Sequence, residues 1–508
     1  MKTTLNNTFI QLLAIYAVVI LLTTLGIITK YFLQFHIAAI IIAILGIITI
    51  KEDKLKIKYH YILLPLAIII TLILRIIPYL NNKIPLGYDA GIYKAVIEAN
   101  LNNLPQWVFT GITTEPGFIY LTQILKQFFT TNTILTTILI LFTGILALAI
   151  YITTKEYTNK STAILAILIY SISLIQFKTF WFMYYKNIIA LALLLFSFYA
   201  FKKDKTKLFI ILATLTGAIH RPTFYLLGLT FLIYTIISKN KKQNIIKGII
   251  ILALTSLFYL GKFSQEIFIV FEPLIKGYTQ PGQSPGTFID FFTYQYSILP
   301  YLPLAILGLF HLIKKKDLNL ITIYTLSSLA IVYFQFFFYN RFIIMLDIGL
   351  IITAAIGFSL LIQNKKKLGT IITIILLLSA GILAVNESIN SKPLISQEEL
   401  EAIEYLQNTE NNSYVMATTS LYSPYILGYS DRNTIAPGLF DYNKHEQPEW
   451  TIFWTTKDIK EIKDFLNEYE KPLYIFIGKQ QPDNIKKFKE CFKIYYQKNE
   501  NKIYQYTC

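Results

Sequence analysis

Charged side chains are scarce in this sequence. Only 15% of its 508 residues are Asp, Glu, Lys or Arg, whereas 54% are apolar, and the mean hydropathy is +0.51. So little charge cannot cover the surface of a soluble protein of this length, which excludes that class. The composition indicates a polytopic membrane protein.

The charge that is present is divided unevenly along the chain. Residues 387–508 carry 14 Lys and Arg against 18 Asp and Glu, a net charge of −4, whereas the whole chain has a net charge of +16. The excess of +20 in residues 1–386 comes mainly from short Lys clusters between apolar runs, where lysines orient helices in a bilayer. This placement does not suit a nucleic-acid surface, so we expect no nucleic-acid partner.

Thirteen apolar runs in residues 1–386 have the length of membrane-crossing helices. They cover residues 8–29, 32–50, 59–79, 132–153, 161–177, 183–201, 207–220, 222–237, 246–262, 297–313, 318–338, 342–362 and 368–386. The first run is longer than a signal-peptide core and lacks a small-residue cleavage site, so we expect it to be retained. The predicted fold is an all-α polytopic membrane bundle of about 13 transmembrane helices, followed by a separate domain at 387–508.

Lysine clusters fall on alternate connections between these runs and mark the cytoplasmic side of the cell membrane. They lie at residues 51–58, 155–160, 202–207, 239–247, 314–316 and 365–367. The amino terminus is therefore expected inside. The loops at 80–131, 178–182 and 263–296, together with the domain from 387, are expected outside.

The runs 207–220 and 222–237 could also form one long helix. Merging them would place the lysines at 239–247 on the face opposite the other clusters, so the charge pattern favours two helices. The intervening sequence His220-Arg221-Pro222 favours a break as well, because proline suits the first turn of a helix and not its interior.

Arginine is rare in the membrane part and occurs on one side of it. Every inner cation is Lys, whereas Arg75, Arg221 and Arg341 lie at or near outer helix ends, where the positive-inside rule gives no reason for them. A guanidinium group can bind phosphate through two parallel hydrogen bonds, whereas Lys is a point charge. The arginines therefore predict a phosphate site at the outer face.

Arg341 and the pair His220-Arg221 each have a structural alternative. Arg341 follows Tyr339 and Asn340 and could be an interfacial anchor among aromatic residues. His220 and Arg221 could satisfy backbone carbonyls at the turn, although two adjacent polar groups at such a position are costly, which favours a site.

Lys186, Arg75 and Asp347 also have structural alternatives. Lys186 follows Trp181-Phe182-Met183-Tyr184-Tyr185, a run typical of an aromatic belt. Arg75 is expected to extend toward the membrane surface. Asp347 lies inside its span and is expected to pair with a neighbouring helix.

An acidic residue stands in an unusual setting after the third run. Asp89 lies in the short, aromatic-rich stretch Gly87-Tyr88-Asp89-Ala90-Gly91-Ile92-Tyr93-Lys94, and Glu115 follows in the same loop. The loop 80–131 has amphipathic helical patterns near residues 90–97 and 119–128, so we expect interfacial helices pressed against the bundle. Alternatively, Asp89 is only the N-cap of the first helix.

The layout and the motif Tyr88-Asp89-Ala90-Gly91-Ile92-Tyr93 resemble the GT-C superfamily of membrane glycosyltransferases. That superfamily includes the protein O-mannosyltransferases, the catalytic subunit of oligosaccharyltransferase and the aminoarabinose transferase. Its members have many spans, a large first outer loop with an acidic catalytic residue near its start, and frequently an outer C-terminal domain. The resemblance covers roughly the first 386 residues in layout and is specific only at the motif.

Two features depart from that superfamily. The large loop follows the third span, whereas in the family it usually follows the first, which implies either two extra amino-terminal helices or a different start of the family-like part. The chain also lacks a second acidic pair and the Asp-x-Asp motif of the metal-dependent members. We therefore expect no cofactor and no metal requirement, with a divalent metal as the open alternative.

The resemblance implies a chemistry for the candidate residues. A polyprenyl-phosphate-linked sugar donor would have its lipid between the helices and its phosphate at the outer face. The donor-phosphate ligands would be Arg341, Arg221, His220 and Lys186. Asp89, or Glu115 in its place, would be the general base on an acceptor hydroxyl, and attack would expel the lipid phosphate with inversion. Candidate substrate contacts are Tyr88, Tyr93 and Tyr339.

The acceptor stays open between a glycan, a lipid and a protein. The Gly-rich signatures that bind nucleotide phosphates are absent, so a nucleotide-sugar donor is not expected. A flippase or transporter of lipid-linked sugars would also have many spans and outer arginines, but would not need a folded C-terminal domain or a carboxylate on an outer loop. An oligosaccharide ligase or polymerase would place its large loop later, and the sequence Pro281-Gly282-Gln283-Ser284-Pro285-Gly286 in the 263–296 loop suits that class.

Residues 387–508 predict a small extracytoplasmic α/β domain, either a structural lid or a holder of the acceptor. Ser396-Gln397-Glu398-Glu399 is a capping box that opens a helix through Leu406. A second helix is expected at about 456–468. Strands are expected at 414–417, 434–436 and 473–477.

The only cysteines, Cys491 and Cys508, flank a predicted hairpin. With its turn centred on Asn499-Glu500 the two cysteines lie opposite each other, within reach of a disulfide in a compartment that permits one. A slip of one residue would pair the apolar residues better and misalign the sulfurs. Both registers stay open.

Overall fold

The computed structural model of this chain describes residues 2–25, 32–49, 55, 57, 59–99, 115–260, 289–336, 339–417, 419, 421–435, 445, 447–479 and 490–508. The chain divides into two compact units. The helical unit comprises Met1–Asn81, Glu115–Tyr120 and Thr137–Ser391, and the sheet unit comprises Asn82–Thr114, Leu121–Thr136 and Lys392–Cys508. This division differs from a boundary at residue 387, because parts of the 80–131 loop pack with the C-terminal elements.

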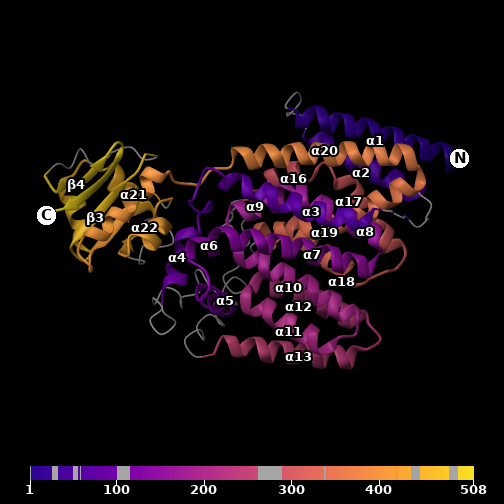
Figure 1. Ribbon diagram of the computed structural model, residues 1–508, viewed down its shortest axis with the longest axis horizontal. Helices are drawn as coiled ribbons and strands as arrows, with labels where there is room; N and C mark the ends of the chain where they lie inside the picture. The colour runs from indigo at the N-terminus through magenta and orange to yellow at the C-terminus, as the bar shows by residue number, and fades with distance from the viewer. Residues whose placement is uncertain are drawn as a thin grey trace. The chain divides into compact units, whose positions relative to one another are not determined.

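The helical unit is a bundle of long apolar helices (Figure 1). A chain that crosses lipid must satisfy its backbone hydrogen bonds internally, which long apolar runs achieve only as helices. Its helices are α1 (Lys2–Thr24), α2 (Phe32–Thr49), α3 (His60–Ile76), α7 (Leu139–Tyr157), α8 (Lys160–Ile172), α9 (Leu174–Trp181), α10 (Tyr185–Lys202), α11 (Thr206–Ile219), α12 (Arg221–Ile237), α13 (Lys241–Phe258), α16 (Phe291–Ile298), α17 (Leu302–Lys314), α18 (Leu320–Tyr333), α19 (Tyr339–Asn364) and α20 (Lys366–Asn390). Within the described residues, each of the thirteen predicted runs overlaps one of these helices or an adjacent pair.

The described helices give the chain a multi-pass membrane character. Six are long and apolar enough to cross a membrane. Two bent pairs, α8 with α9 (51°) and α16 with α17 (83°), pass the same test together, each as a broken span or a re-entrant loop. Four further apolar helices are shorter. The break at His220 is confirmed, since α11 ends at Ile219 and α12 begins at Arg221. The count of thirteen crossings stays a prediction.

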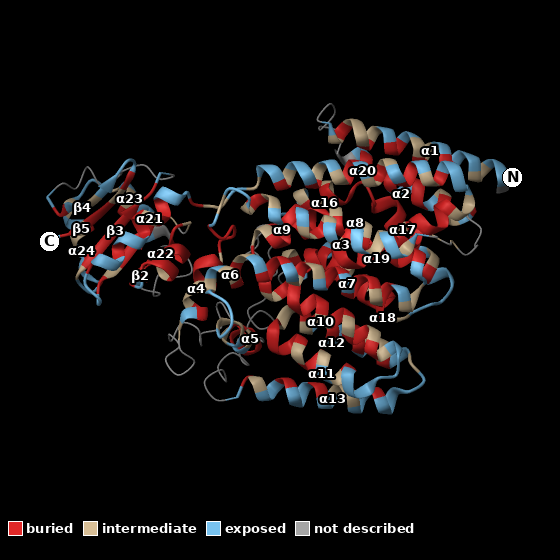
Figure 2. Ribbon diagram, in the orientation of Figure 1, coloured by how far each residue is buried: buried red, intermediate tan, exposed pale blue. Residues whose placement is uncertain are grey.

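Helix α19 forms the core of the bundle (Figure 2). Every residue from Phe342 to Ile362 is buried. Two glycines let α17 and α19 approach closely: a Cβ on Gly308 would lie 1.9 Å from the Thr353 carbonyl oxygen, and one on Gly357 would lie 2.0 Å from that of Leu304. Small residues at such crossings are typical of helix packing in membranes.

Asp347 of α19 connects the two bent helix pairs. Its carboxylate accepts hydrogen bonds from Ser173 Oγ (2.9 Å) and Gln176 Nε2 (2.9 Å), at the bend between α8 and α9. It also accepts one from the Tyr301 hydroxyl (2.5 Å), which precedes α17. The prediction that Asp347 pairs with neighbouring helices is confirmed.

The sheet unit contains a five-stranded sheet in the order β2-β1-β3-β5-β4. Its strands are β1 (Tyr414–Ala417), β2 (Asn433–Ile435), β3 (Leu473–Ile477), β4 (Phe492–Lys498) and β5 (Asn501–Tyr506). Its helices beyond residue 391 are α21 (Gln397–Tyr405), α22 (Ser423–Tyr429), α23 (Gln447–Thr455) and α24 (Ile459–Asn467). The capping box before α21 and the three predicted strands are confirmed, whereas α22 and α23 were not predicted.

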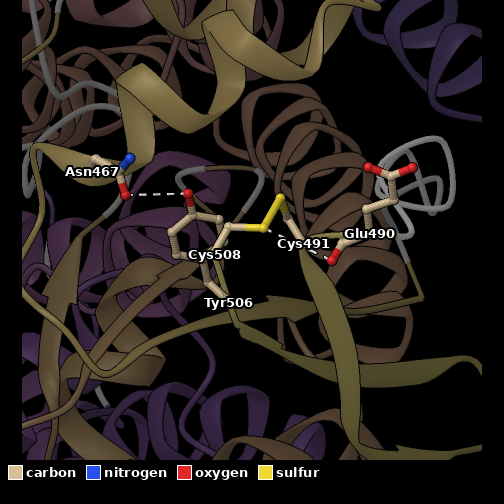
Figure 3. Close-up of a disulfide and its surroundings, with 5 residues drawn as sticks. All are labelled: Asn467, Glu490, Cys491, Tyr506 and Cys508. Atoms are coloured by element: carbon tan, nitrogen blue, oxygen red, sulfur yellow. Dashed lines mark hydrogen bonds between the residues drawn. A yellow bond between two sulfur atoms is a disulfide. The ribbon is translucent and has the colours of Figure 1, made fainter.

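Figure 3 shows the disulfide between Cys491 and Cys508, whose Cα atoms are 5.1 Å apart. Next to the turn, Lys498 pairs with Asn501 as in the register that favours the disulfide. A bulge between Ile494 and Tyr496 then shifts the register by one residue. Beyond the bulge, β4 and β5 therefore pair in the other register, the one that favours apolar pairs. Cys508 follows the last paired residue of β5 and still forms the disulfide with Cys491.

Helix α4 (Ala90–Glu98) belongs to the sheet unit and packs against α22. Its apolar face was expected against the bundle. In the structure Ala90, Ile92, Val96 and Ile97 are buried, and two glycines make the contact with α22 tight. A Cβ on Gly91 would lie 1.7 Å from the Pro424 carbonyl oxygen, so only glycine fits there.

Candidate functional site

Four of the predicted site residues meet in the helical unit around one buried carboxylate. Glu115 is only 3% exposed and precedes α5 (Pro116–Lys126). Its carboxylate forms an ion pair with Lys186 Nζ at 2.8 Å and a longer one with Arg221 Nε at 3.7 Å. Residues 115, 186 and 221 are far apart in sequence, and this cluster is formed by the tertiary fold.

Each side chain of the cluster sits at a helix end. Lys186 is in the first turn of α10, after a turn in which Met183 has a positive φ of 59°. Arg221 opens α12. Glu115 lies beside the C-terminal end of α11 because Gly117 packs closely against that end. A Cβ on Gly117 would lie 2.7 Å from the Ala218 backbone.

The electrostatics of Glu115 follow from this setting. Burial raises the pKa of its carboxyl, but the charges of Lys186, Arg221 and His220 together outweigh burial and bring the pKa to about 2. The carboxylate is therefore ionised throughout the physiological range and is a weak base. A general base works best with a pKa near the operating pH, so this environment suits Glu115 to holding Lys186 and Arg221 rather than to accepting a proton.

His220 has a structural contact and lies in the same cluster. It is the N-cap of α12, and its Nδ1 lies 3.4 Å from the Thr223 backbone N–H and 2.8 Å from the Thr223 hydroxyl. The ring is 4% exposed and interacts electrostatically with Glu115, Lys186, Arg221 and Arg341. Arg341 is thus also within electrostatic range of this group, in which, among the described residues, Lys186 and Arg221 lie directly against Glu115.

Arg341 and Tyr339 stand in the first turn of α19. Arg341 is half-buried, whereas Tyr339 is buried and its ring lies edge-on to Phe291 at 6.4 Å between centroids. Tyr339 therefore supports the start of α19 beside Arg341.

Arg75 differs from the expectation that it extends toward the membrane surface. Its side chain is fully buried, with Nη1 donating to the Thr71 carbonyl at 3.0 Å. The guanidinium carbon lies 5.5 Å from the Tyr170 ring centroid and 5.9 Å from that of Phe180. The expectation is wrong because Arg75 faces the interior of the bundle, where aromatic rings replace water around the cation.

An apolar groove of about 440 Å³ lies in the same unit as the cation cluster. It is lined by Tyr120, Ile211, Thr214, Leu215, Leu254, Leu257 and Phe258. Tyr120 lies five residues after Glu115, and Leu215 lies five residues before His220. Since an α-helix rises 1.5 Å per residue, the groove begins about 7.5 Å from the cluster along each helix.

Asp89, Tyr88 and Tyr93 lie in the sheet unit. Asp89 occupies the N-cap position of α4, yet its side chain makes no capping hydrogen bond. Its Oδ2 lies 3.5 Å from the hydroxyl of Tyr93, which is 1% exposed. Tyr88 is also buried. The interpretation of Asp89 as a simple cap is not supported by this geometry.

Helix α22 holds the backbone on both sides of Asp89. The Tyr425 hydroxyl donates to the Gly87 carbonyl at 2.9 Å, and Pro424 touches Gly91. A Cβ on Gly428 would lie 2.2 Å from the Gly91 carbonyl oxygen. Sequence reasoning missed this contact, because nothing local in residues 423–429 indicates a partner more than 300 residues earlier.

The described part of the chain contains no group of three or more His, Cys, Asp and Glu side chains placed to hold a metal ion. The stretch Pro281–Gly286, which suited a ligase or polymerase, lies outside the described residues.

The fold is similar to that of solved membrane glycosyltransferases. The oligosaccharyltransferase AglB from Archaeoglobus fulgidus, in complex with an inhibitory peptide and a dolichol-phosphate, has a TM-score of 0.64 and 14% identity over 82% of this chain and 69% of its own. ArnT from Cupriavidus metallidurans, bound to undecaprenyl phosphate, has a TM-score of 0.58 and 9% identity over 88% of this chain and 97% of its own. At these identities the likeness shows a shared GT-C-like fold and no more.

Comparison with curated protein sequences gives no match. The sequence profile of the EpsG family matches residues 81–396, which include the motif around Asp89 and all members of the cation cluster. This match covers more than half of the chain. The protein therefore belongs to the EpsG family.

Proposed function

We propose that this protein is a membrane glycosyltransferase that moves a sugar from a polyprenyl-phosphate-linked donor to an acceptor hydroxyl outside the cytoplasm, with inversion at the anomeric carbon. The observation that carries the proposal is the cation cluster around Glu115. Lys186 and Arg221 lie against Glu115, Arg341 is within electrostatic range of His220, and ammonium and guanidinium groups are the side chains that bind phosphate.

The apolar groove next to the cluster supports a lipid-linked donor. A free sugar phosphate would gain nothing from Leu215, Leu254 and Leu257, whereas an isoprenoid chain would bury apolar surface against them. The phosphate would then lie at the end of the groove near His220. The similar folds of AglB and ArnT, whose structures contain a dolichol-phosphate and undecaprenyl phosphate, agree with this class of donor.

Asp89 is the proposed general base. The acceptor hydroxyl attacks the anomeric carbon, the bond from that carbon to the phosphate oxygen breaks, and the lipid phosphate leaves with the bonding electrons. Asp89 takes the proton of the hydroxyl. Lys186, Arg221 and Arg341 stabilise the charge that grows on the leaving phosphate. Support for Asp89 comes from its motif, from its missing cap hydrogen bond and from the grip of α22 on its flanks.

The proposed topology follows from the lysine pattern. Thirteen crossings place the amino terminus in the cytoplasm and the sheet unit outside, where the disulfide between Cys491 and Cys508 can persist. A lipid phosphate bound at outer helix ends would be on the same side as the acceptor.

The test replaces Asp89 by Asn in the purified full-length protein. Asn keeps the size and the capping ability of Asp and removes its basicity, so transfer from a polyprenyl-phosphate sugar should fall by roughly 10²-fold or more, while donor-lipid binding persists. Asp458→Asn is the matched control, because Asp458 is a true N-cap that accepts from the Lys460 backbone N–H at 2.8 Å. Near-normal transfer by Asp89→Asn would remove Asp89 from the mechanism. Flipping of the lipid-linked sugar by the wild-type protein without any transfer would replace the transferase by a transporter.

A further inference from the structure

A second cleft, of about 850 Å³, lies in the sheet unit. Its wall consists of the start of the 80–131 loop, the C-terminal half of α4, the segment from Lys126 to Leu135, and residues of the helices α21 and α22. The cleft is distinct from the phosphate cluster, none of whose residues lines it. Its volume is that of a site for a sizeable organic ligand.

Polar and apolar side chains both line this cleft. Eleven of its seventeen residues carry a polar side chain, among them the amides of Gln127, Asn132 and Gln397. None of the residues that line it belongs to a strand, so the wall offers no strand edge for a peptide to pair with. A ligand with many hydroxyl groups would satisfy these donors and acceptors.

Two adjacent aromatic side chains in the wall are unusually exposed. Phe128 is 73% exposed and Phe129 is 41% exposed. Large apolar side chains exposed together commonly mark a binding surface. Placed among amides and hydroxyls, they offer flat faces to the C–H faces of sugar rings.

More lysines than carboxylates line this cleft. Lys94 and Glu98 pair with each other at 2.5 Å, and Lys94 also lies 4.8 Å from the Tyr429 ring centroid. Lys126 Nζ donates to the Glu98 carbonyl at 2.9 Å and keeps its charge, so the lining holds three lysines and two carboxylates, those of Glu98 and Glu404. Burial raises the pKa of Glu404 more than Lys94 lowers it. The cleft thus has a cationic excess suited to carboxylate groups on a ligand.

We infer that this cleft binds an acidic glycan, a chain of several sugars that includes carboxylate-bearing sugars, as the acceptor of the transfer reaction. The inference rests on the proposed function. That function requires an acceptor with a hydroxyl group, and the inference names the class of molecule that carries it. Lys94 and Glu98 stand five and nine residues after Asp89, about 7.5 and 13.5 Å along α4. The cleft would therefore bind sugars of the glycan that lie away from the reacting hydroxyl. A single sugar would not fill the cleft.

The experiment measures binding to the full-length protein in detergent by calorimetry, without donor. The probes are a hyaluronan tetrasaccharide, which alternates glucuronate and N-acetylglucosamine, neutral maltotetraose and tetraglutamate. We expect the acidic tetrasaccharide to bind at least tenfold more tightly than either of the others. Lys83→Ala and Phe128→Ala should each weaken it about tenfold, the loss expected for one charge-assisted or apolar contact. Both side chains are exposed, so neither change should disturb the fold.

The matched control is Lys493→Ala, an exposed lysine of β4 that does not line the cleft. Equal binding of tetraglutamate would reduce the cleft to a general anion site and overturn the inference, as would equal effects of Lys83→Ala and Lys493→Ala. Donor-lipid binding is measured on the same samples. Glycan binding with no transfer from any donor would contradict the transferase and leave the cleft as a glycan site, whereas transfer to other acceptors without glycan binding would contradict only the cleft.

Discussion

Replacing Glu115 by Gln tests whether this carboxylate organises the phosphate cluster. Gln has nearly the same shape but cannot balance Lys186 at 2.8 Å or Arg221 at 3.7 Å. All three groups are largely shielded from water, so two cations would be left close together without their counter-ion. We expect a less stable protein that binds the donor phosphate poorly, since its cations are no longer held in place.

The size of the effect follows from the pKa of Glu115. A fall from 4.5 to about 2 on folding corresponds to about 3 kcal/mol of stabilisation of the ionised carboxylate by its surroundings. Because the pKa is lowered, this contribution is complete above pH 4.5 and is lost only as the pH falls toward 2. Glu115→Gln should therefore cost about 3 kcal/mol at any pH from 6 to 8.

A double-mutant cycle with Lys186→Met separates the pair from other effects. Removing Lys186 alone leaves a buried carboxylate with only its longer contact, at a cost of about 3–5 kcal/mol. The double variant lacks both charges, so it should be more stable than the sum of the two single changes predicts, by about 1–3 kcal/mol.

The assay is reversible unfolding in mixed micelles, followed by intrinsic fluorescence. The control cycle is Glu401→Gln with Lys498→Met, an exposed pair of similar length at 2.7 Å, for which a much smaller coupling is expected. Additive effects of Glu115→Gln and Lys186→Met would refute the reasoning. So would a Glu115→Gln variant that keeps donor affinity but loses only the rate of transfer, because that pattern belongs to a base.

Two further predictions concern the position of Asp89 and the topology. Gly91→Ala would place a Cβ 1.7 Å from the Pro424 carbonyl, so it should destabilise the sheet unit by about 1–3 kcal/mol and lower the rate of transfer, whereas Gly228→Ala, whose Cβ would meet nothing within 4 Å, should do neither. A cysteine introduced at Asn240, in a protein whose native cysteines are paired, should resist an impermeant thiol reagent applied from outside intact cells, and efficient labelling would contradict the cytoplasmic position of that loop.

The helices of the bundle could be predicted from sequence because each depends on local properties. An apolar run of about twenty residues has few alternatives to a helix in lipid, and His220-Arg221-Pro222 marks a break by the chemistry of proline alone. The hairpin at Cys491 and Cys508 is local as well. Its bulge was not predicted, because it arises where the best apolar pairing and the turn require different registers.

The sequence predicted candidate residues for the site, but it did not predict which of them contact one another. Arg221 and Arg341 were predicted from sequence because they stand at helix ends where the lysine pattern gives no reason for a cation. That Glu115 pairs with Lys186 depends on the close packing of Gly117 on Ala218, which no local pattern reveals. The full burial of Arg75 likewise depends on Tyr170 and Phe180, which come from other helices.

Asp89 and Glu115, two of the three acidic residues of the 80–131 loop, are held by different contacts, and this difference supports their proposed roles. Glu115 is held by cations at 2.8 and 3.7 Å, and these contacts lower its affinity for a proton. Asp89 has the Tyr93 hydroxyl at 3.5 Å and no capping hydrogen bond, while its backbone is fixed through Gly87 and Gly91. A base needs a fixed position, whereas a phosphate site needs cations fixed by a carboxylate that stays ionised. In the proposed reaction, Asp89 meets the first requirement and Glu115 the second.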